Sequence, residues 1–233
     1  MIGRGEGELV KQPMLRRAMA RRMVEAAAVP CFYLRVTADV RGLVAARARM
    51  KAAGAAVVPS LNDCVVAAAG RALRDHPNAN ASWDDGAVVV HGRVNVGVAV
   101  AVPGGLVVPA VYDADRLTVG EVSGAVREVA ALAAARKLPR ELLEDSTFTV
   151  SNLGMYGIED FDPVVNPPQA AILGVGTTLP GDDGRQAMRL TLGCDHRVLT
   201  GAEGAPLLTA IRDRLQDADA LLAGHVPAAE AAA

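Results

Sequence analysis

The stretch TFTVSNLGMYG at residues 147–157 begins as a short apolar strand and ends in a turn that contains glycine. A second segment, DHRVLTG at residues 195–201, also follows an apolar run. Ser151 and His196 therefore place a hydroxyl and an imidazole at the ends of two predicted strands. An imidazole can accept a proton from an attacking nucleophile, and a hydroxyl can stabilise the oxyanion formed from a thioester. The two segments therefore make Ser151 and His196 candidates for a pair that acts on a thioester.

Outward from these segments, helices and strands alternate along the chain without an internal repeat. The clearest strand is predicted over residues 93–103, where valines alternate with small residues. Ser60 is expected to cap a helix, with Asp63 at the capping-box position. Further strands are predicted at 31–40, 106–111, 148–150, 170–175 and 188–194, and helices at 13–28, 40–53, 118–136, 202–216 and 218–222. This order of elements predicts a mixed α/β sandwich.

Composition and charge exclude several classes of protein. Of the 233 residues, 51% are hydrophobic and only 3% aromatic, so Val, Leu, Ala and Ile must build the core. The net charge of −2, without a block of like charge, argues against a nucleic-acid surface. The local excess of Arg16, Arg17, Arg21 and Arg22 is interpreted as a solvated or ion-paired helix face rather than a polyanion site. No apolar run reaches about 18 residues and no signal layout is present, so we expect a cytoplasmic protein without a membrane segment.

The cysteines do not suggest a metal or a disulfide framework. Cys31, Cys64 and Cys194 are odd in number and lack the close spacing of a zinc site. Buried thiols are the expected outcome, and no metal is predicted. Because residues two apart share a face of a strand, Cys194 could line the same cavity as His196.

The two opening segments are similar to the signatures of one family, the dihydrolipoamide acyltransferase (E2) cores of 2-oxo acid dehydrogenase complexes. That family shares its fold with chloramphenicol acetyltransferase. Further blocks resemble the same family in the same order, at residues 14–23, 30–33, 60–63, 77–83, 103–109 and 165–170. The resemblance covers nearly the whole chain and implies a two-layer, mixed-sheet α/β sandwich of the chloramphenicol acetyltransferase type.

The resemblance also implies roles for particular residues. His196 falls on the family's catalytic histidine and would act as general base. Ser151 matches the hydroxyl that hydrogen-bonds the tetrahedral oxyanion, and transfer would be direct, without an acyl-serine. Acetyl-CoA is the implied co-substrate. The family forms homotrimers in which the histidine of one chain meets the serine of its neighbour, so a homotrimer is expected.

Two positions depart from the family pattern. Thr200 stands where the pattern His-Arg-x-x-Asp-Gly has an aspartate, and Cys31 stands where a histidine is usual. The family aspartate pairs with an arginine and holds the catalytic loop, so here Thr200 would support the loop with a neutral hydrogen bond. Breaking a buried ion pair from one side costs about 3–5 kcal/mol unless the remaining charge is rehoused. Arg17 and Arg21 are the candidates for an arginine that lost its partner.

The sequence leaves three functional hypotheses. We expect an N-terminal arm at 1–12, one catalytic domain at 13–224 and a flexible tail at 225–233, with no lipoyl attachment site. The main hypothesis is a stand-alone enzyme resembling those of tetronate and spirotetronate biosynthesis, which would acetylate a hydroxyl of a small antibiotic intermediate. The alternative is the dihydrolipoamide acyltransferase core of a dehydrogenase complex, whose partner would be a lipoyl domain. A second alternative is an inactive trimeric scaffold.

Overall fold

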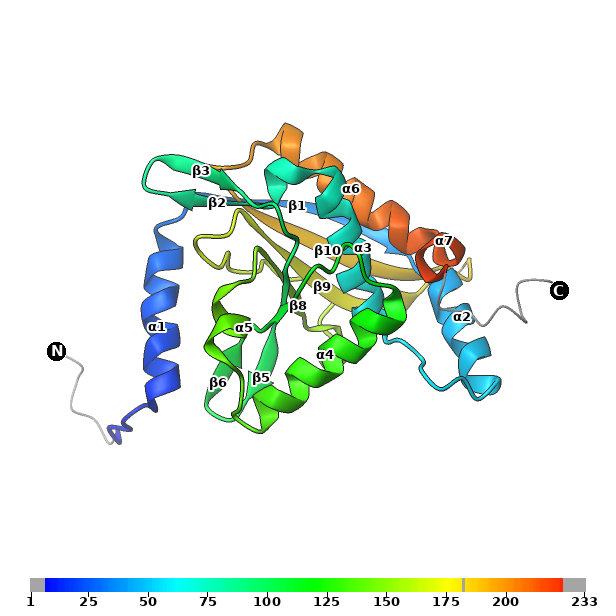
Figure 1. Ribbon diagram of the computed structural model, residues 1–233, viewed down its shortest axis with the longest axis horizontal. Helices are drawn as coiled ribbons and strands as arrows, with labels where there is room; N and C mark the ends of the chain where they lie inside the picture. The colour runs from blue at the N-terminus through cyan, green and yellow to red at the C-terminus, as the bar shows by residue number, and fades with distance from the viewer. Residues whose placement is uncertain (1–6, 182, 224–233) are drawn as a thin grey trace.

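A six-stranded mixed sheet forms the centre of the protein in a computed structural model, which describes residues 7–181 and 183–223 (Figure 1). The strand order is β1-β10-β9-β8-β4-β7, and β8 runs parallel to both of its neighbours while all other pairs are antiparallel. The strands are β1 (Cys31–Asp39), β4 (Val96–Val98), β7 (Ala110–Val111), β8 (Phe148–Asn152), β9 (Ala171–Pro180) and β10 (Gln186–Asp195). The predicted mixed α/β architecture is confirmed.

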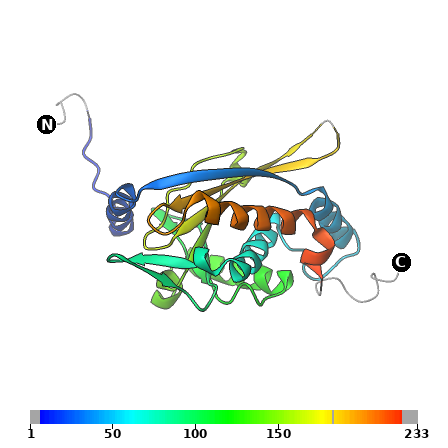
Figure 2. The ribbon, with the colours of Figure 1, turned by 90° about the horizontal axis from the view of Figure 1, so that it is seen from above.

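Helices cover one face of this sheet, as the view from above shows (Figure 2). The helices of the described chain are α1 (Met14–Ala27), α2 (Arg41–Ala52), α3 (Leu61–Asp75), α4 (Val119–Ala134), α5 (Arg140–Glu144), α6 (Gly201–Gln216) and α7 (Ala218–Leu222), with the short 3-10 helices η1 (Pro77–Ala79) and η2 (Gly154–Tyr156). The central helix α3 begins with the predicted capping box, in which Ser60 and Asp63 bond each other's backbone N–H. Ten residues of α3 are buried, because the helix packs between the sheet, α4 and α6.

A crossing segment, residues 158–165, covers part of the other face of the sheet. Three strand glycines, Gly174, Gly176 and Gly193, make room for it. A Cβ at Gly176 would lie 1.9 Å from the carbonyl oxygen of Glu159, and one at Gly193 would lie 3.1 Å from that of Pro163. Arg35 of β1 also forms ion pairs with Asp160 and Asp162 in this segment. The chain between β8 and β9 is thus fixed against the sheet by backbone proximity and by charge.

The strand predicted over residues 93–103 is wrong as a single element. β4 ends at Val98, and the chain then leaves the main sheet as β5 (Val100–Val102), which pairs only with β6 (Gly105–Val107). The single strand predicted at 106–111 is likewise divided into β6 and β7. Pro109 separates these two strands, because it has no N–H with which to continue a ladder. The valine pattern reported the extended backbone correctly but not which partner supplies its hydrogen bonds.

A second two-stranded ribbon joins β2 (Ala81–Asp84) to β3 (Ala87–Val90). Ser82 and Trp83 lie in this separate hairpin, which is linked to the rest of the protein by an isolated bridge between Ser82 and Gln169. A second bond runs from the N–H of Trp83 to the carbonyl of Pro168, at 2.9 Å. The hairpin is therefore held against the chain just before β9.

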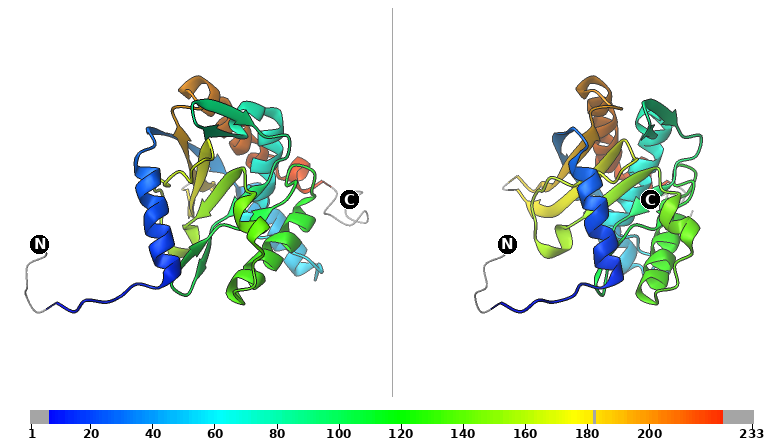
Figure 3. Two further views of the ribbon diagram at one scale, coloured as in Figure 1. Left: turned by 60° about the vertical axis from the view of Figure 1, so that its left-hand side comes forward. Right: turned by 90° about the vertical axis from the view of Figure 1, so that its left-hand side faces the viewer.

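Helix α1 lies beside the β5–β6 ribbon, away from the helical layer (Figure 3). Leu15 and Met19 contact the ribbon at Gly105. The predicted solvated face is present, since Arg16, Arg17 and Arg21 are exposed. Residues 7–12 form neither helix nor strand, while residues 1–6 of the predicted arm and all of the predicted tail, 225–233, lie outside the described residues. Within the described part of the chain, none of the helices has the length and apolarity to cross a membrane.

Candidate active site

His196 occupies the first position of a tight turn that follows β10. Its backbone N–H donates to the carbonyl of Pro30 at 2.9 Å, which ties the turn to the start of β1. Its ring lies 4.7 Å from the ring of Phe32, measured between centroids, with the planes tilted by 52°. The side chain is exposed, so the imidazole is free to meet a substrate.

The residues that flank His196 form an ion pair that sequence reasoning missed. The Asp195 carboxylate is 2% exposed and accepts from the backbone N–H of Arg197 at 2.9 Å and from its Nη2 at 2.7 Å. Through this bond, Asp195 raises the pKa of the Arg197 guanidinium above its usual value. The guanidinium carbon also lies 5.1 Å from the centre of the Trp83 ring. Only the spacing of the two charges, two residues apart about His196, could have signalled this cluster.

The three cysteines lie near or within the core. Burial raises the pKa of the Cys64 thiol and of the Cys194 thiol to about 12. Cys31 is half-buried opposite Asp195, and its pKa is raised first by desolvation and then by that carboxylate. The prediction that Cys194 shares a cavity with His196 is wrong. Strand alternation ends at Asp195, and Cys194 instead faces Gly204 of α6.

Ser151 lies near the end of β8 and is half-buried. The chain after it is held by neutral contacts. Asn152 donates from its side-chain nitrogen to the side-chain oxygen of Asn62 at 3.1 Å and accepts from the N–H of Gly154 at 2.8 Å. A Cβ at Gly154 would lie 2.6 Å from the carbonyl oxygen of Gly176, so only glycine allows this approach. Ser151 is therefore presented by a closely packed backbone turn.

One chain does not bring Ser151 and His196 together. Ser151 is aligned with Gly174 of β9, and Gly174 is aligned with Thr191 of β10. His196 lies five residues beyond Thr191. With strand rises of about 3.3 Å and strand spacings of about 4.8 Å, the two backbones are roughly 16 Å apart along the sheet and roughly 10 Å apart across it. Chemistry that needs both side chains requires a second chain.

Thr200 caps helix α6. Its hydroxyl and its backbone N–H both donate to one carboxylate oxygen of Glu203, at 2.8 and 2.9 Å. The residue is exposed, and within the described residues neither Arg17 nor Arg21 forms a hydrogen bond or an ion pair with it. In this chain the loop end is thus held by a neutral hydroxyl and a helix cap.

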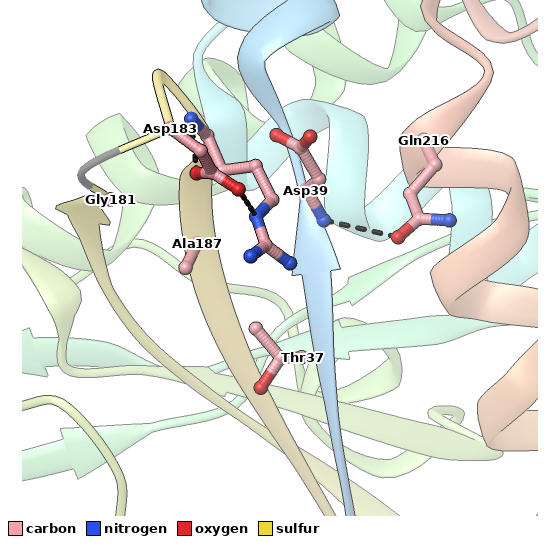
Figure 4. Close-up of a pocket in the computed structure, with 7 residues that line it drawn as sticks. Thr37, Asp39, Gly181, Asp183, Ala187 and Gln216 are labelled. Atoms are coloured by element: carbon pink, nitrogen blue, oxygen red, sulfur yellow. Dashed lines mark hydrogen bonds and ion pairs between the residues drawn. The ribbon is translucent and has the colours of Figure 1, made fainter.

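A surface hollow of about 540 Å³ lies far from these residues (Figure 4). It is lined by the last residues of β1, including Asp39, by the β9–β10 turn and by Gln216 of α6. Ala187 on its wall is nine positions before His196, or about 30 Å along β10. Its charged groups are already paired, Asp183 with Arg185 and Asp39 with Arg41. Among the described residues no group of three or more acidic, histidine or cysteine side chains could hold a metal ion.

The fold and the exposed imidazole at a strand end define a protein of the chloramphenicol acetyltransferase fold class. A solved chloramphenicol acetyltransferase superposes with a TM-score of 0.56 at 16% identity, over 84% of this chain and 94% of its own, which supports the fold alone. The family model for 2-oxoacid dehydrogenases acyltransferase (catalytic domain) matches residues 5–223. The chain belongs to this family and is an acyltransferase.

Individual relatives support the same assignment. The chain is 39% identical over 230 residues to the dihydrolipoyllysine-residue acetyltransferase component of the pyruvate dehydrogenase complex of Rhizobium meliloti, covering 91% of this chain and 51% of the relative. The mitochondrial component 3 of Arabidopsis thaliana is 42% identical over 207 residues, 83% of this chain and 38% of that relative. The Azotobacter vinelandii dihydrolipoamide acetyltransferase superposes with a TM-score of 0.86 at 31% identity, over 94% of this chain and 95% of that structure. The chain spans about half the length of the Rhizobium relative.

Proposed function

We propose that the protein is the catalytic core of a dihydrolipoamide acetyltransferase, which moves an acetyl group between CoA and a dihydrolipoyl thiol. The observation that carries this proposal is the 39–42% identity to dihydrolipoyllysine-residue acetyltransferases over 83–91% of the chain. This favours the alternative hypothesis of the sequence over transfer to a natural-product hydroxyl. Retention of both His196 and Ser151 supports an active enzyme rather than a scaffold.

The proposed transfer is a direct thiol exchange. The imidazole of His196 takes the proton of the attacking thiol as its sulfur bonds to the acetyl carbonyl carbon. The Ser151 hydroxyl donates to the oxyanion of the tetrahedral intermediate. When the intermediate collapses, the carbon–sulfur bond to the other thiol breaks, and His196 returns the proton to that leaving sulfur. Acetyl-CoA and dihydrolipoamide would thus become CoA and acetyl-dihydrolipoamide without an acyl-enzyme.

The wide separation of Ser151 and His196 supports a site shared between chains. We propose a homotrimer in which His196 of one subunit faces Ser151 of the next. In a ring of three copies, each contact joins two different surfaces, one from each of the two subunits. Each site would therefore combine the His196 half of one subunit with the Ser151 half of the next. Light scattering should give three chains per particle or a multiple of three. A stable monomer that remains active at micromolar concentration would contradict the shared site.

Mixing two inactive variants tests the shared site directly. Ser151→Ala and His196→Ala subunits, unfolded and refolded together in equal amounts, should regain activity at about a quarter of the sites, because a random ring places an intact histidine beside an intact serine with that frequency. Each variant refolded alone is the control. No recovery from the mixture, while wild-type refolds fully, would mean that both groups act within one chain.

A second candidate, acetyl transfer to a small hydroxyl compound such as a tetronate, is favoured by Cys31, where the family resemblance calls for histidine. Thr200 supports it less. The Azotobacter vinelandii structure concerns the role of a serine, a histidine and an asparagine in catalysis, and its asparagine follows its histidine by four positions, as Thr200 follows His196 here. A neutral side chain at this position therefore has a counterpart in a dihydrolipoamide acetyltransferase.

The acceptor assay decides between the candidates. Purified protein with acetyl-CoA is given dihydrolipoamide or a panel of primary alcohols that includes a hydroxymethyl tetronate, and release of CoA is followed. We expect turnover with dihydrolipoamide to be at least about a hundredfold above that with any alcohol. A hydroxyl is less acidic than a thiol, so a site built for a thiol would activate it poorly. Preference for an alcohol would support the second candidate. Turnover with neither class would favour the inactive scaffold.

A further inference from the structure

We propose that Arg197 is a positioning residue that holds the imidazole of His196 in place through Asp195 and Trp83. This inference rests on the proposed function, in which His196 is the general base. Arg197 itself is not placed against the reacting atoms.

The contacts of Arg197 enclose the turn that carries His196. Its backbone N–H, Nε and Nη2 all donate to the Asp195 carboxylate, at distances of 2.7–3.2 Å. The N–H groups of Val198 and Leu199 both donate to the Asp195 carbonyl, at 3.0 and 2.9 Å. The residue before the imidazole and the residue after it are thus joined through both side chain and backbone. The turn between them has little freedom to open.

Trp83 fixes this cluster to a different part of the chain. Its ring lies against the guanidinium, and its backbone is bonded to Pro168 just before β9. A cation over an indole face is attracted by the electrons of the ring, most strongly where water is partly excluded. The Arg197 side chain is 32% exposed, so the contact is partly desolvated. The Trp83 ring therefore keeps the Arg197 side chain folded back over Asp195.

The position of the His196 ring follows from this arrangement. Because Asp195 and Arg197 meet each other, the ring between them is directed elsewhere, and it packs against Phe32 of β1. An exposed imidazole without such restraint would sample several rotamers and lose entropy when a substrate orders it. Holding a catalytic group in one geometry matters, since a displacement of about 1 Å can lower turnover on the order of a hundredfold.

The same cluster sets the charge beside the imidazole. Among the described residues, the titratable and charged groups that face the turn are Asp195, Arg197 and, from the adjacent strand β1, Cys31. The carboxylate and the guanidinium cancel when both are present. Removing the guanidinium leaves a net negative charge that stabilises a protonated imidazole, and removing the carboxylate charge leaves a net positive charge that opposes it. The two losses therefore act on His196 with opposite sign.

Two variants test this inference in the acetyl-CoA and dihydrolipoamide assay. Arg197→Gln and Asp195→Asn should each lower kcat about ten- to a hundredfold while KM for both substrates changes by less than about threefold, because transition-state geometry is lost and substrate contact is not. The acid limb of the pH–rate profile should move to higher pH in Arg197→Gln and to lower pH in Asp195→Asn. A role confined to folding would lower the yield or the melting temperature but would not produce opposite shifts.

The chain offers a matched control. Arg93 pairs with Asp113 at 2.7 Å, and its guanidinium lies 5.4 Å from the Tyr112 ring, which is the same arrangement away from His196. Arg93→Gln and Asp113→Asn should leave the pH profile unchanged. At Trp83, the substitution Trp83→Phe keeps an aromatic face and should preserve most of kcat, whereas Trp83→Leu should lower kcat as Arg197→Gln does.

The outcomes separate this inference from the proposed function. If His196→Ala abolishes turnover but Arg197→Gln and Asp195→Asn leave the acid limb unmoved, or move it in one direction, the positioning role is overturned and the general base stands. If His196→Ala retains wild-type turnover, the proposed mechanism itself fails. Arg197→Lys supplies a folded variant should Arg197→Gln be insoluble, and it should keep the acid limb of the wild-type protein because the charge is retained.

Discussion

The two halves of the proposed site are held by different forces. The His196 turn depends on charge and on aromatic rings, with the buried Asp195 carboxylate bound to Arg197 and the imidazole packed at a tilt against Phe32. The Ser151 end has no charged contact of this kind in the described structure and depends on the close approach of Gly154 to β9 and on the amide of Asn152.

This difference matches the proposed role of each half, a general base at His196 and an oxyanion donor at Ser151. A general base gains and loses a proton, so the charges around it determine at which pH it works. A hydroxyl that donates to an oxyanion keeps its charge state throughout, so its distance from the reacting atom matters most. Substitutions in the two halves should therefore differ in kind, and not only in size.

The largest effect is expected at His196. His196→Ala removes the proposed general base and should lower kcat by about a hundred- to ten-thousandfold. The melting temperature should change little, because the ring is exposed. Initial rates with acetyl-CoA and dihydrolipoamide, alongside thermal unfolding, measure both quantities. Turnover close to that of the wild-type protein would remove this half of the site from the mechanism.

The serine half should respond next. Ser151→Ala deletes one oxyanion donor and should cost about 3 kcal/mol of transition-state stabilisation, or roughly a hundredfold in kcat. The pH–rate profile should keep its shape, in contrast to the profiles of the Asp195 and Arg197 variants. Ser151→Thr, which retains a hydroxyl, is the matched comparison. A displaced pH profile in Ser151→Ala would mean that the two halves are electrostatically coupled.

A substitution at Gly154 tests whether close backbone packing positions Ser151. Gly154→Ala should destabilise the fold by about 1–3 kcal/mol, since the new Cβ meets the backbone of Gly176 and must displace β8 or β9. Turnover should fall as well, because Ser151 lies three residues away. The control is Gly124→Ala in α4, where the Cβ meets nothing within 4 Å and should be neutral or slightly stabilising. Equal melting temperatures for both variants would contradict this account.

The smallest effect is expected at Thr200. Thr200→Asp places a second carboxylate beside Glu203 in the first turn of α6 and removes the hydroxyl donor, so a destabilisation of about 0.5 kcal/mol is expected. Thr200 is exposed, so the new carboxylate would remain in contact with water and the expected cost is small. Thr200→Asn is the neutral control. A higher melting temperature together with faster turnover in Thr200→Asp would show that an arginine does meet this position.

Some features of the fold could be predicted from the sequence because their causes are local. The cap of α3 was readable at Ser60 and Asp63, since both hydrogen bonds close within three residues. The long strands β1, β9 and β10 and the helices α4 and α6 follow from apolar periodicity in the same way. His196 and Ser151 were found because they stand at the ends of apolar runs within motifs that resemble one family.

Other features required contacts between distant parts of the chain. The strand predicted at 93–103 divides after Ala99, whose N–H still donates to the carbonyl of Val150 in β8, whereas β5 pairs only with β6. No pattern within eleven residues contains that information, because periodicity depends on side chains and strand partners are chosen by the backbone.

The sequence by itself determined the class of elements and their order, and it predicted the two side chains that are proposed to carry the chemistry. Only the tertiary structure decided that Trp83 lies over Arg197, and that Ser151 and His196 lie at opposite ends of β8 and β10, which are separated by β9. The physical reason is the range of the forces involved. Hydrophobic alternation and helix capping act over a few residues, whereas ion pairs, ring contacts and strand register join residues that only the completed fold brings into reach.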